Sequence, residues 1–282
     1  MESAEDLFFT SPPWAGRRKE KYKLGLRPIL REDWFSQPVS GEVAQHKKDL
    51  LDKNYDQVVA VADDGSAELA LLNFLPNKKR LYPDAIADMA LQVEDDLCIM
   101  EVDGRQRLLA ACVCSPSYWN LRDKIGKSMR LIHENVPTLN HKVGNTIERF
   151  FKQCTAEKPF ERRNWFIHGT DQRFNLSPED PPETHPRNWY IRSERETVCK
   201  LDENFLLFTI NTEFYPLKSI FNYEQARTDL MAAIDALDTG QKEYFGGFDK
   251  CLKVLSYLAV SYTHLRAHET DSYLVCRLLL EK

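Results

Sequence analysis

Two short apolar segments joined by a tight-turn dipeptide most constrain the fold of this chain. Leu97–Val102 and Arg107–Cys114 have the apolar character of buried strands, and Asp103-Gly104 between them is typical of a β-hairpin turn. Because a hairpin joins antiparallel neighbours, these strands predict a sheet that is at least partly antiparallel. Further strands are expected at Gln57–Ala62, Asn164–Ile167, Tyr190–Lys200 and Phe205–Asn211.

Helical spacing of apolar residues precedes and follows these strands. The expected helices are Gly41–Asn54, Ser66–Leu75, Pro83–Leu91, Tyr118–His133, Thr146–Cys154, Tyr223–Leu237 and Lys242–Leu258. Strands and helices do not alternate one by one along the chain, which argues against a doubly wound parallel fold. We therefore predict an α+β fold, an antiparallel sheet flanked by helices, with helical additions at the N- and C-terminal ends.

The two ends of the chain are expected to lie outside this domain. Residues 1–22 are polar, contain Pro12-Pro13 and predict a flexible leader. When back-translated, residues 260–270 and 274–282 resemble two successive parts of a transposase-type sequencing adapter. Segments of such origin are excluded from fold reasoning. We expect a single domain over 23–259 and an adapter-derived, non-native tail over 260–282.

Charge and composition exclude several classes of protein. The net charge of −5 gives no general attraction for phosphates, so a nucleic-acid partner is not expected. The longest apolar run, Leu108–Cys114, is far too short to cross a bilayer, and the acidic start of the chain is unlike a signal peptide. These features predict a cytoplasmic protein without membrane partners, whose cysteines are thiols.

Common catalytic motifs are missing from the sequence. It contains no G-x-G-x-x-G, no Walker A loop, no G-x-S-x-G and no H-E-x-x-H. The acidic run Glu94-Asp95-Asp96 has the composition of a solvated turn ahead of a strand. The residues alone therefore indicate no reaction.

Several groups of residues are informative through their order. They are Leu26-Arg27-Pro28, Val93–Met100 with Pro116–Trp119, Lys124–Gly126 with Ile132–Pro137, Arg163-Asn164-Trp165, and Arg192-x-x-Arg195-Glu196 with Leu206–Ile210. Together they resemble the family of haem-dependent oxidative N-demethylase α-subunit-like proteins. The resemblance runs from about residue 24 to residue 258. It implies a PAS-like haem-binding fold.

The resemblance also implies a reaction and partners. Family members of known activity oxidise a small secondary amine, dimethylamine, with O2 and release formaldehyde. Haem b is the implied cofactor, and electrons come from NADPH through partner reductase subunits that carry flavin and an iron–sulfur cluster. This chain has neither a dinucleotide-binding motif nor ferredoxin cysteine spacing, so those modules must belong to partners. Two alternatives stay open: a haem-binding PAS-type gas or redox sensor, and an interaction domain without turnover.

His133 is the predicted haem ligand. Helical spacing places it on one face with Ile125 and Met129, and a single neutral imidazole is a common axial ligand of haem iron. The alternative is a packed histidine that caps the helix. His168 is the second candidate ligand. Three polar residues near these histidines, Tyr118, Glu134 and Asn164, are candidates for contacts with a bound polar molecule.

Three arginines are predicted to bind the haem propionates. A guanidinium pairs with a carboxylate through two parallel hydrogen bonds, which makes Arg163, Arg192 and Arg195 suitable partners. The alternative is an ordinary ion pair along the sheet, for example between Arg195 and Glu194 or Glu196.

Overall fold

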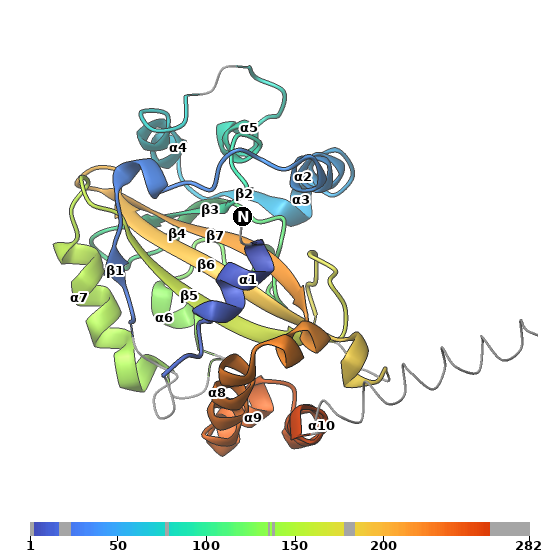
Figure 1. Ribbon diagram of the computed structural model, residues 1–282. Helices are drawn as coiled ribbons and strands as arrows, with labels where there is room; N and C mark the ends of the chain where they lie inside the picture. The colour runs from blue at the N-terminus through green and yellow to red at the C-terminus, as the bar shows by residue number, and fades with distance from the viewer. Residues whose placement is uncertain are drawn as a thin grey trace, which may run out of the picture.

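A seven-stranded antiparallel sheet forms the centre of the molecule (Figure 1). The computed structural model describes residues 3–16, 24–76, 79–134, 136, 139–177 and 184–259. The strands are β1 (Arg27–Pro28), β2 (Val59–Val61), β3 (Asp96–Glu101), β4 (Leu108–Cys112), β5 (Phe160–His168), β6 (Tyr190–Lys200) and β7 (Phe205–Pro216). Their order is β1-β5-β6-β7-β3-β4-β2. The predicted α+β class is confirmed, whereas the adapter-like tail 260–282 falls outside the described residues.

The connectivity of the five central strands is that of a PAS-like sheet. The hairpin β3–β4 comes first, a helical stretch follows, and β5, β6 and β7 then form a meander. The last of these strands, β7, pairs with the first, β3. The helical stretch between β4 and β5 therefore has to fold back across one face of the sheet.

Ten helices and five short helical turns are assigned in the described parts of the chain. The helices are α1 (Ala4–Thr10), α2 (Gly41–Lys53), α3 (Tyr55–Val58), α4 (Ser66–Leu71), α5 (Ala85–Ala90), α6 (Met129–Ile132), α7 (Asn145–Gln153), α8 (Glu224–Asp235), α9 (Thr239–Tyr244) and α10 (Phe248–Ala259). The short turns are η1 (Arg31–Asp33), η2 (Leu121–Asp123), η3 (Asn140–Gly144), η4 (Pro186–Asn188) and η5 (Leu217–Asn222).

One face of the sheet is covered along its whole width. We call it the covered face, and on β5 it carries Glu161, Arg163, Trp165 and Ile167, because strand residues alternate between the two faces. Helices α2, α4 and α5 pack over its β2–β3–β4 half. Helices α1, α8 and α10 pack over its β5–β6–β7 half. In the view of Figure 1, the first group lies at the top of the picture and α8–α10 lie at the bottom.

The opposite face is covered only in part. This open face carries Arg162, Asn164, Phe166 and His168 of β5. A core formed by Ile132, Phe151 and neighbouring residues packs η2, α6 and α7 against β3 and β4. Beyond that core, many residues of the open face are only half-buried. They include Arg162, Asn164, Phe166, Glu196, Phe208, Ile210 and Phe214.

The predicted helix Tyr118–His133 is wrong. The chain forms η2, then a turn, then the short helix α6, which Ser128 caps by accepting a hydrogen bond from the Leu131 N–H. Gly126 has a φ of +74° and Tyr118 a φ of +55°, and neither value is compatible with a right-handed helix. Likewise Gly246 and Gly247, with φ of +114° and +94°, divide the predicted helix Lys242–Leu258 into α9 and α10.

The predicted flexible leader is wrong for residues 3–16. Ser3 and Asp6 form a capping box that starts α1, and Phe8, Phe9 and Trp14 are buried. The indole Nε1 of Trp14 donates to the carbonyl of Ala226 on α8 at 2.8 Å. The start of the chain therefore packs against its C-terminal helices. Residues 1–2 and 17–22 of the predicted leader lie outside the described ranges.

Candidate functional site

The imidazole of His133 has a defined tautomer. His133 follows α6 directly, and its Nδ1 lies 3.0 Å from the carbonyl oxygen of Met129. A carbonyl oxygen only accepts hydrogen bonds, so Nδ1 must carry the hydrogen. In the neutral ring, the lone pair is therefore on Nε2. The contact is local to one helical turn, which is why α6 itself orients the ring.

His133 is kept neutral by its surroundings. Burial lowers its pKa and outweighs the hydrogen bond to Met129, which raises it; the positive charges of Lys124 and Arg162 also lower it. Among the described residues, none forms a hydrogen bond with Nε2. A neutral histidine whose Nδ1–H bonds a backbone carbonyl is the arrangement typical of metal-bound imidazoles. His133 also caps α6, so the ligand and capping roles are compatible.

His168 is held differently. It is fully buried at the end of β5, and its Nε2 lies 3.2 Å from Ser117 Oγ. Tyr118 stacks on the ring with centroids 4.9 Å apart. Burial, followed by the charges of Arg192 and Lys250, lowers the pKa of His168 to about 3. The ring is thus enclosed by side chains, and its Nδ1 has no hydrogen-bond partner among the described residues.

The four predicted site residues do not come together. Arg163 and Arg195 face each other across β5 and β6 on the covered face. Arg192 lies on the open face, opposite Phe166, and His133 is on the same side as α6. Of the three arginines, only Arg192 is therefore on the same side of the sheet as His133.

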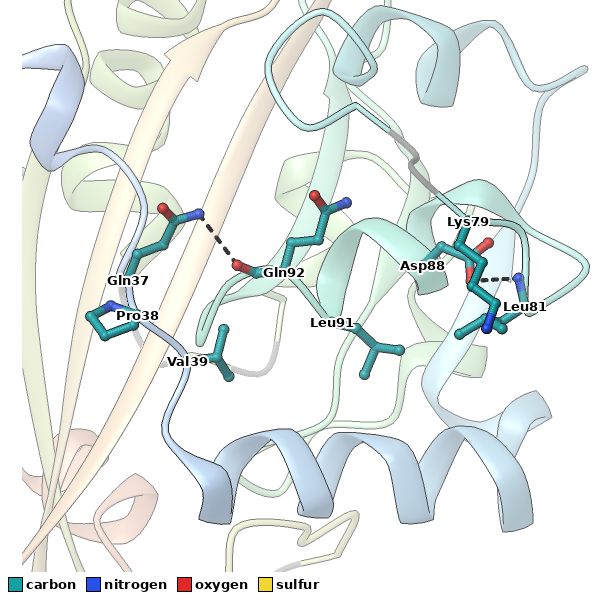
Figure 2. A pocket seen from close by; sticks show the side chains of 8 residues that line it. All are labelled: Gln37, Pro38, Val39, Lys79, Leu81, Asp88, Leu91 and Gln92. Carbon is teal, nitrogen blue, oxygen red and sulfur yellow. Dashed lines mark hydrogen bonds between the residues drawn. The ribbon is translucent and has the colours of Figure 1, made fainter.

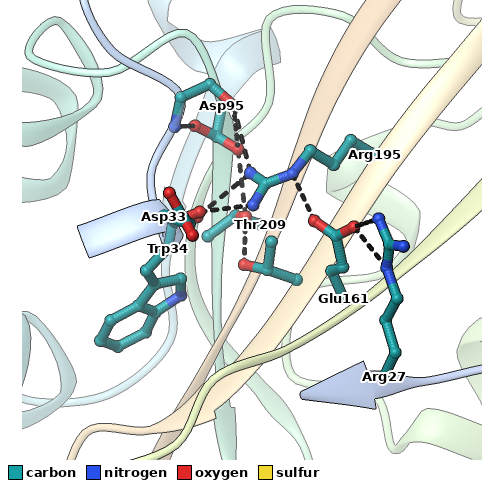
Figure 3. Close-up of polar contacts among 9 residues, drawn as sticks. Arg27, Asp33, Trp34, Asp95, Glu161, Arg195 and Thr209 are labelled. Atoms are coloured by element: carbon teal, nitrogen blue, oxygen red, sulfur yellow. Dashed lines mark hydrogen bonds and ion pairs between the residues drawn. The ribbon is translucent and has the colours of Figure 1, made fainter. Parts of the chain in front are cut away.

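Arg195 belongs to a structural network that fastens the N-terminal segment (Figure 3). Its Nε donates to Glu161 at 2.8 Å, and its terminal nitrogens bond the carbonyls of Asp33 and Trp34. Arg27 of β1 also donates to Glu161, with Nε at 2.9 Å. Burial alone raises the pKa of Glu161, but the hydrogen bonds from Arg27 and Arg195 outweigh it and lower the pKa. The ion-pair alternative is therefore realised, with Glu161 as the partner.

Arg192 is buried in the open face and only partly satisfied. Its Nε donates to Glu194 at 2.8 Å, and its Nη2 bonds the Ser115 carbonyl and, at 3.1 Å, Thr212 Oγ1. Its Nη1 has no hydrogen-bond partner among the described residues. An unpaired guanidinium nitrogen in the interior is costly, so Nη1 is suited to an additional acceptor.

Two further arginines at this face were not predicted from the sequence. The Nε of Arg162 is ion-paired with Glu196 Oε2 at 3.2 Å. The Nε of Arg173 is 3.7 Å from Glu42 Oε1, and its guanidinium lies over the Phe214 ring, 5.7 Å from the centroid. In each, the buried Nε has no hydrogen-bond acceptor in the described structure. Strand alternation could have placed Arg162 on the same face as Arg192, but only if the register between β5 and β6 were known.

A separate pocket lies on the other side of the sheet (Figure 2). It has a volume of about 720 Å³ and lies between the segment before α2 and the end of α5. Its lining is formed by Gln37, Pro38, Val39, Lys79, Leu81, Asp88, Leu91 and Gln92. Asp88 accepts from the Leu81 N–H at 3.0 Å, and Gln37 donates to the Gln92 carbonyl at 3.3 Å. This lining contains neither histidine nor cysteine, so it offers no common axial ligand for haem iron.

Fold and site together define a class of protein. It is an α+β protein with a PAS-like sheet, one face of which is half-open and bears a neutral histidine, the buried Arg192 and two half-buried arginines. Residues 70–250 match the family model of the haem-dependent oxidative N-demethylase, alpha subunit-like proteins. The chain belongs to this family. No curated protein matches the sequence. Within the described residues, no helix combines the length and the apolar character needed to span a bilayer.

Proposed function

We propose that this protein is a haem-dependent oxidative N-demethylase acting on a small secondary amine of the dimethylamine type. Dimethylamine, O2 and NADPH with one proton would give methylamine, formaldehyde, water and NADP+. The electrons would reach this chain through partner subunits carrying flavin and an iron–sulfur cluster. Membership of the family supports haem dependence and the existence of partner subunits.

The observation that carries the proposal is the geometry of His133. Its Nδ1–H bonds the Met129 carbonyl, its pKa is lowered by burial, and Nε2 is left with a lone pair. These are the properties of an imidazole that binds iron. When bound, haem b would supply the site where O2 is activated.

The open face fits the rest of a haem. The group has a flat apolar ring system and two carboxylates. This face offers half-buried Phe208 and Ile210 beside Arg192, whose Nη1 has no hydrogen-bond partner among the described residues, and Arg162, whose Nε is ion-paired with Glu196. We assign propionate binding to Arg192 and Arg162, because a guanidinium pairs well with a carboxylate. Arg163 and Arg195 lie across the sheet, so the proposal gives them no contact with haem.

A cytoplasmic location is part of the proposal. The cysteines of the described residues, Cys98, Cys112, Cys114, Cys154, Cys199 and Cys251, are all free and buried. Free thiols are the usual state in a reducing compartment, where NADPH is also available.

Turnover tests the proposal. The haem-loaded protein would be given dimethylamine, O2, NADPH and a ferredoxin with its reductase, and formaldehyde would be measured against NADPH consumed. We expect formaldehyde to form with the wild type and to be lost in His133→Ala. A protein that binds haem but releases no formaldehyde from dimethylamine or other small amines would favour the gas or redox sensor. A folded protein that binds no haem would favour the interaction domain.

A further inference from the structure

Positive charge is concentrated in one part of this acidic chain. The whole sequence has a net charge of −5, yet residues 104–163 contain 12 Lys and Arg against five Asp and Glu. This stretch starts at the β3–β4 turn, includes α6 and α7, and ends in β5. Part of this charge lies on the helices that cover part of the open face, with Arg130 on α6 and Arg149 and Lys152 on α7.

Three elements of this stretch are in direct contact and form one surface. The Met129 N–H of α6 donates to the Gln106 carbonyl in the β3–β4 turn at 3.1 Å. The Gln106 side chain in turn donates to the Glu148 carbonyl of α7 at 3.1 Å. We define the basic patch as the cations of these elements and of the loop just before α6. They are Arg105, Arg107, Lys127, Arg130, Arg149 and Lys152, of which Lys127 is half-buried and the others are exposed.

The basic patch adjoins the proposed haem ligand. Helix α6 carries Arg130 and the apolar Leu131, which is 48% exposed, and His133 caps the same helix. A protein that contacts Leu131 and the surrounding cations would approach the imidazole of His133 from outside.

We propose that the basic patch is the docking surface for an acidic electron-transfer protein. The inference rests on the proposed function, which requires a partner that delivers electrons. Opposite charges steer encounter and orient the two proteins, and an exposed apolar side chain within the patch gives a contact for the docked state.

A nucleic acid fits this surface less well than a protein. Arg130 is paired with Glu148, and Arg107 pairs with Glu101 at 3.1 Å, so acidic groups lie between the cations. The negative charge of the remaining chain also opposes a polyanion at longer range. An acidic protein surface, which mixes charges and apolar side chains, can match this pattern.

Charge reversal tests the docking surface. The test variant is Arg105→Glu/Arg149→Glu/Lys152→Glu, whose cations are exposed. The control, Arg187→Glu/Lys218→Glu/Lys253→Glu, makes the same change in net charge at exposed positions of η4, η5 and α10. Binding of two acidic probes, a [2Fe–2S] ferredoxin and a flavodoxin, would be measured by titration calorimetry at about 20 and 200 mM salt.

We expect at least one probe to bind the wild type and the control variant alike, and to bind the test variant about tenfold more weakly, with a smaller salt dependence. Equal effects of the two variants, or no salt-dependent binding of either probe, would overturn the docking proposal. A 20-nucleotide duplex that binds the basic patch as tightly as the two proteins would also overturn the docking proposal. The haem absorption band of each variant is recorded in parallel, so loss of the haem proposal and loss of the docking proposal are separate results.

Discussion

His168 is a neutral, buried histidine near the cations Arg192 and Lys250, and its burial makes the stability of the protein depend on pH. Its folded pKa is about 3, whereas an unfolded histidine titrates near pH 6.5. The stabilisation is therefore complete above about pH 6.5 and is lost as the pH falls, because the unfolded chain binds the proton first. At pH 5 the difference amounts to about 2 kcal/mol.

Urea unfolding at pH 7 and pH 5 measures this effect. We expect the wild type to lose about 2 kcal/mol more between the two pH values than His168→Gln, which has no group to protonate there. His141 is exposed, so His141→Gln is the matched control and should behave as the wild type does. Equal losses for wild type and His168→Gln would contradict the assigned burial of His168.

The break between η2 and α6 depends on a single glycine. Gly126 has a φ of +74°, and a Cβ at this position would meet no atom within 4 Å. Gly126→Ala should therefore destabilise the protein through backbone strain alone, by about 1 kcal/mol. Gly41 at the start of α2 has equal space and no positive φ, so Gly41→Ala should be neutral or slightly stabilising. Denaturant unfolding of both variants at one pH compares them, and equal stabilities would show that Gly126 is not in the left-handed region.

Sequence patterns located most elements but did not predict their faces. The hairpin β3–β4 and the amphipathic helices α2 and α7 were predicted because turn chemistry and periodicity are local signals. Strand β5 was predicted only at Asn164–Ile167, although it covers Phe160–His168. Arg192 and Arg195 are three residues apart in the predicted strand Tyr190–Lys200, so alternation alone places them on opposite faces. Without the register between β5 and β6, the sequence could not show which of the two shares a face with Arg163.

Buried charges were also beyond local signals. The acidic run was interpreted as a solvated turn, yet Asp95 and Asp96 are buried. Asp96 accepts from the Cys114 and Ser115 N–H groups at 2.9 and 2.8 Å, and Lys47 of α2 donates to the Asp95 carbonyl. These partners come from distant parts of the chain, so only the assembled fold shows that the burial is compensated.

The two ends of the described chain pack into one core over the covered face. Trp14 is 1% exposed, contacts Phe8 and Trp165, and bonds the Ala226 carbonyl. Trp14→Ala should therefore reduce the free energy of unfolding by about 3–5 kcal/mol, although it lies far along the sequence from the helices it touches. Thermal or urea unfolding measures this loss of stability. Trp119→Ala, at a half-buried position over the other face, should reduce the free energy of unfolding by less. A reduction of under about 1 kcal/mol in Trp14→Ala would show that α1 does not belong to this core.

The central claim is that His133 is the axial ligand of a haem bound on the open face. The most direct measurement is the visible absorption spectrum of the protein with added hemin, for the wild type, His133→Ala and His168→Ala. We predict a sharp Soret band in the wild type, its loss or displacement in His133→Ala, and its retention in His168→Ala. A Soret band that is unchanged in His133→Ala, or no band in a folded wild type, would contradict the account.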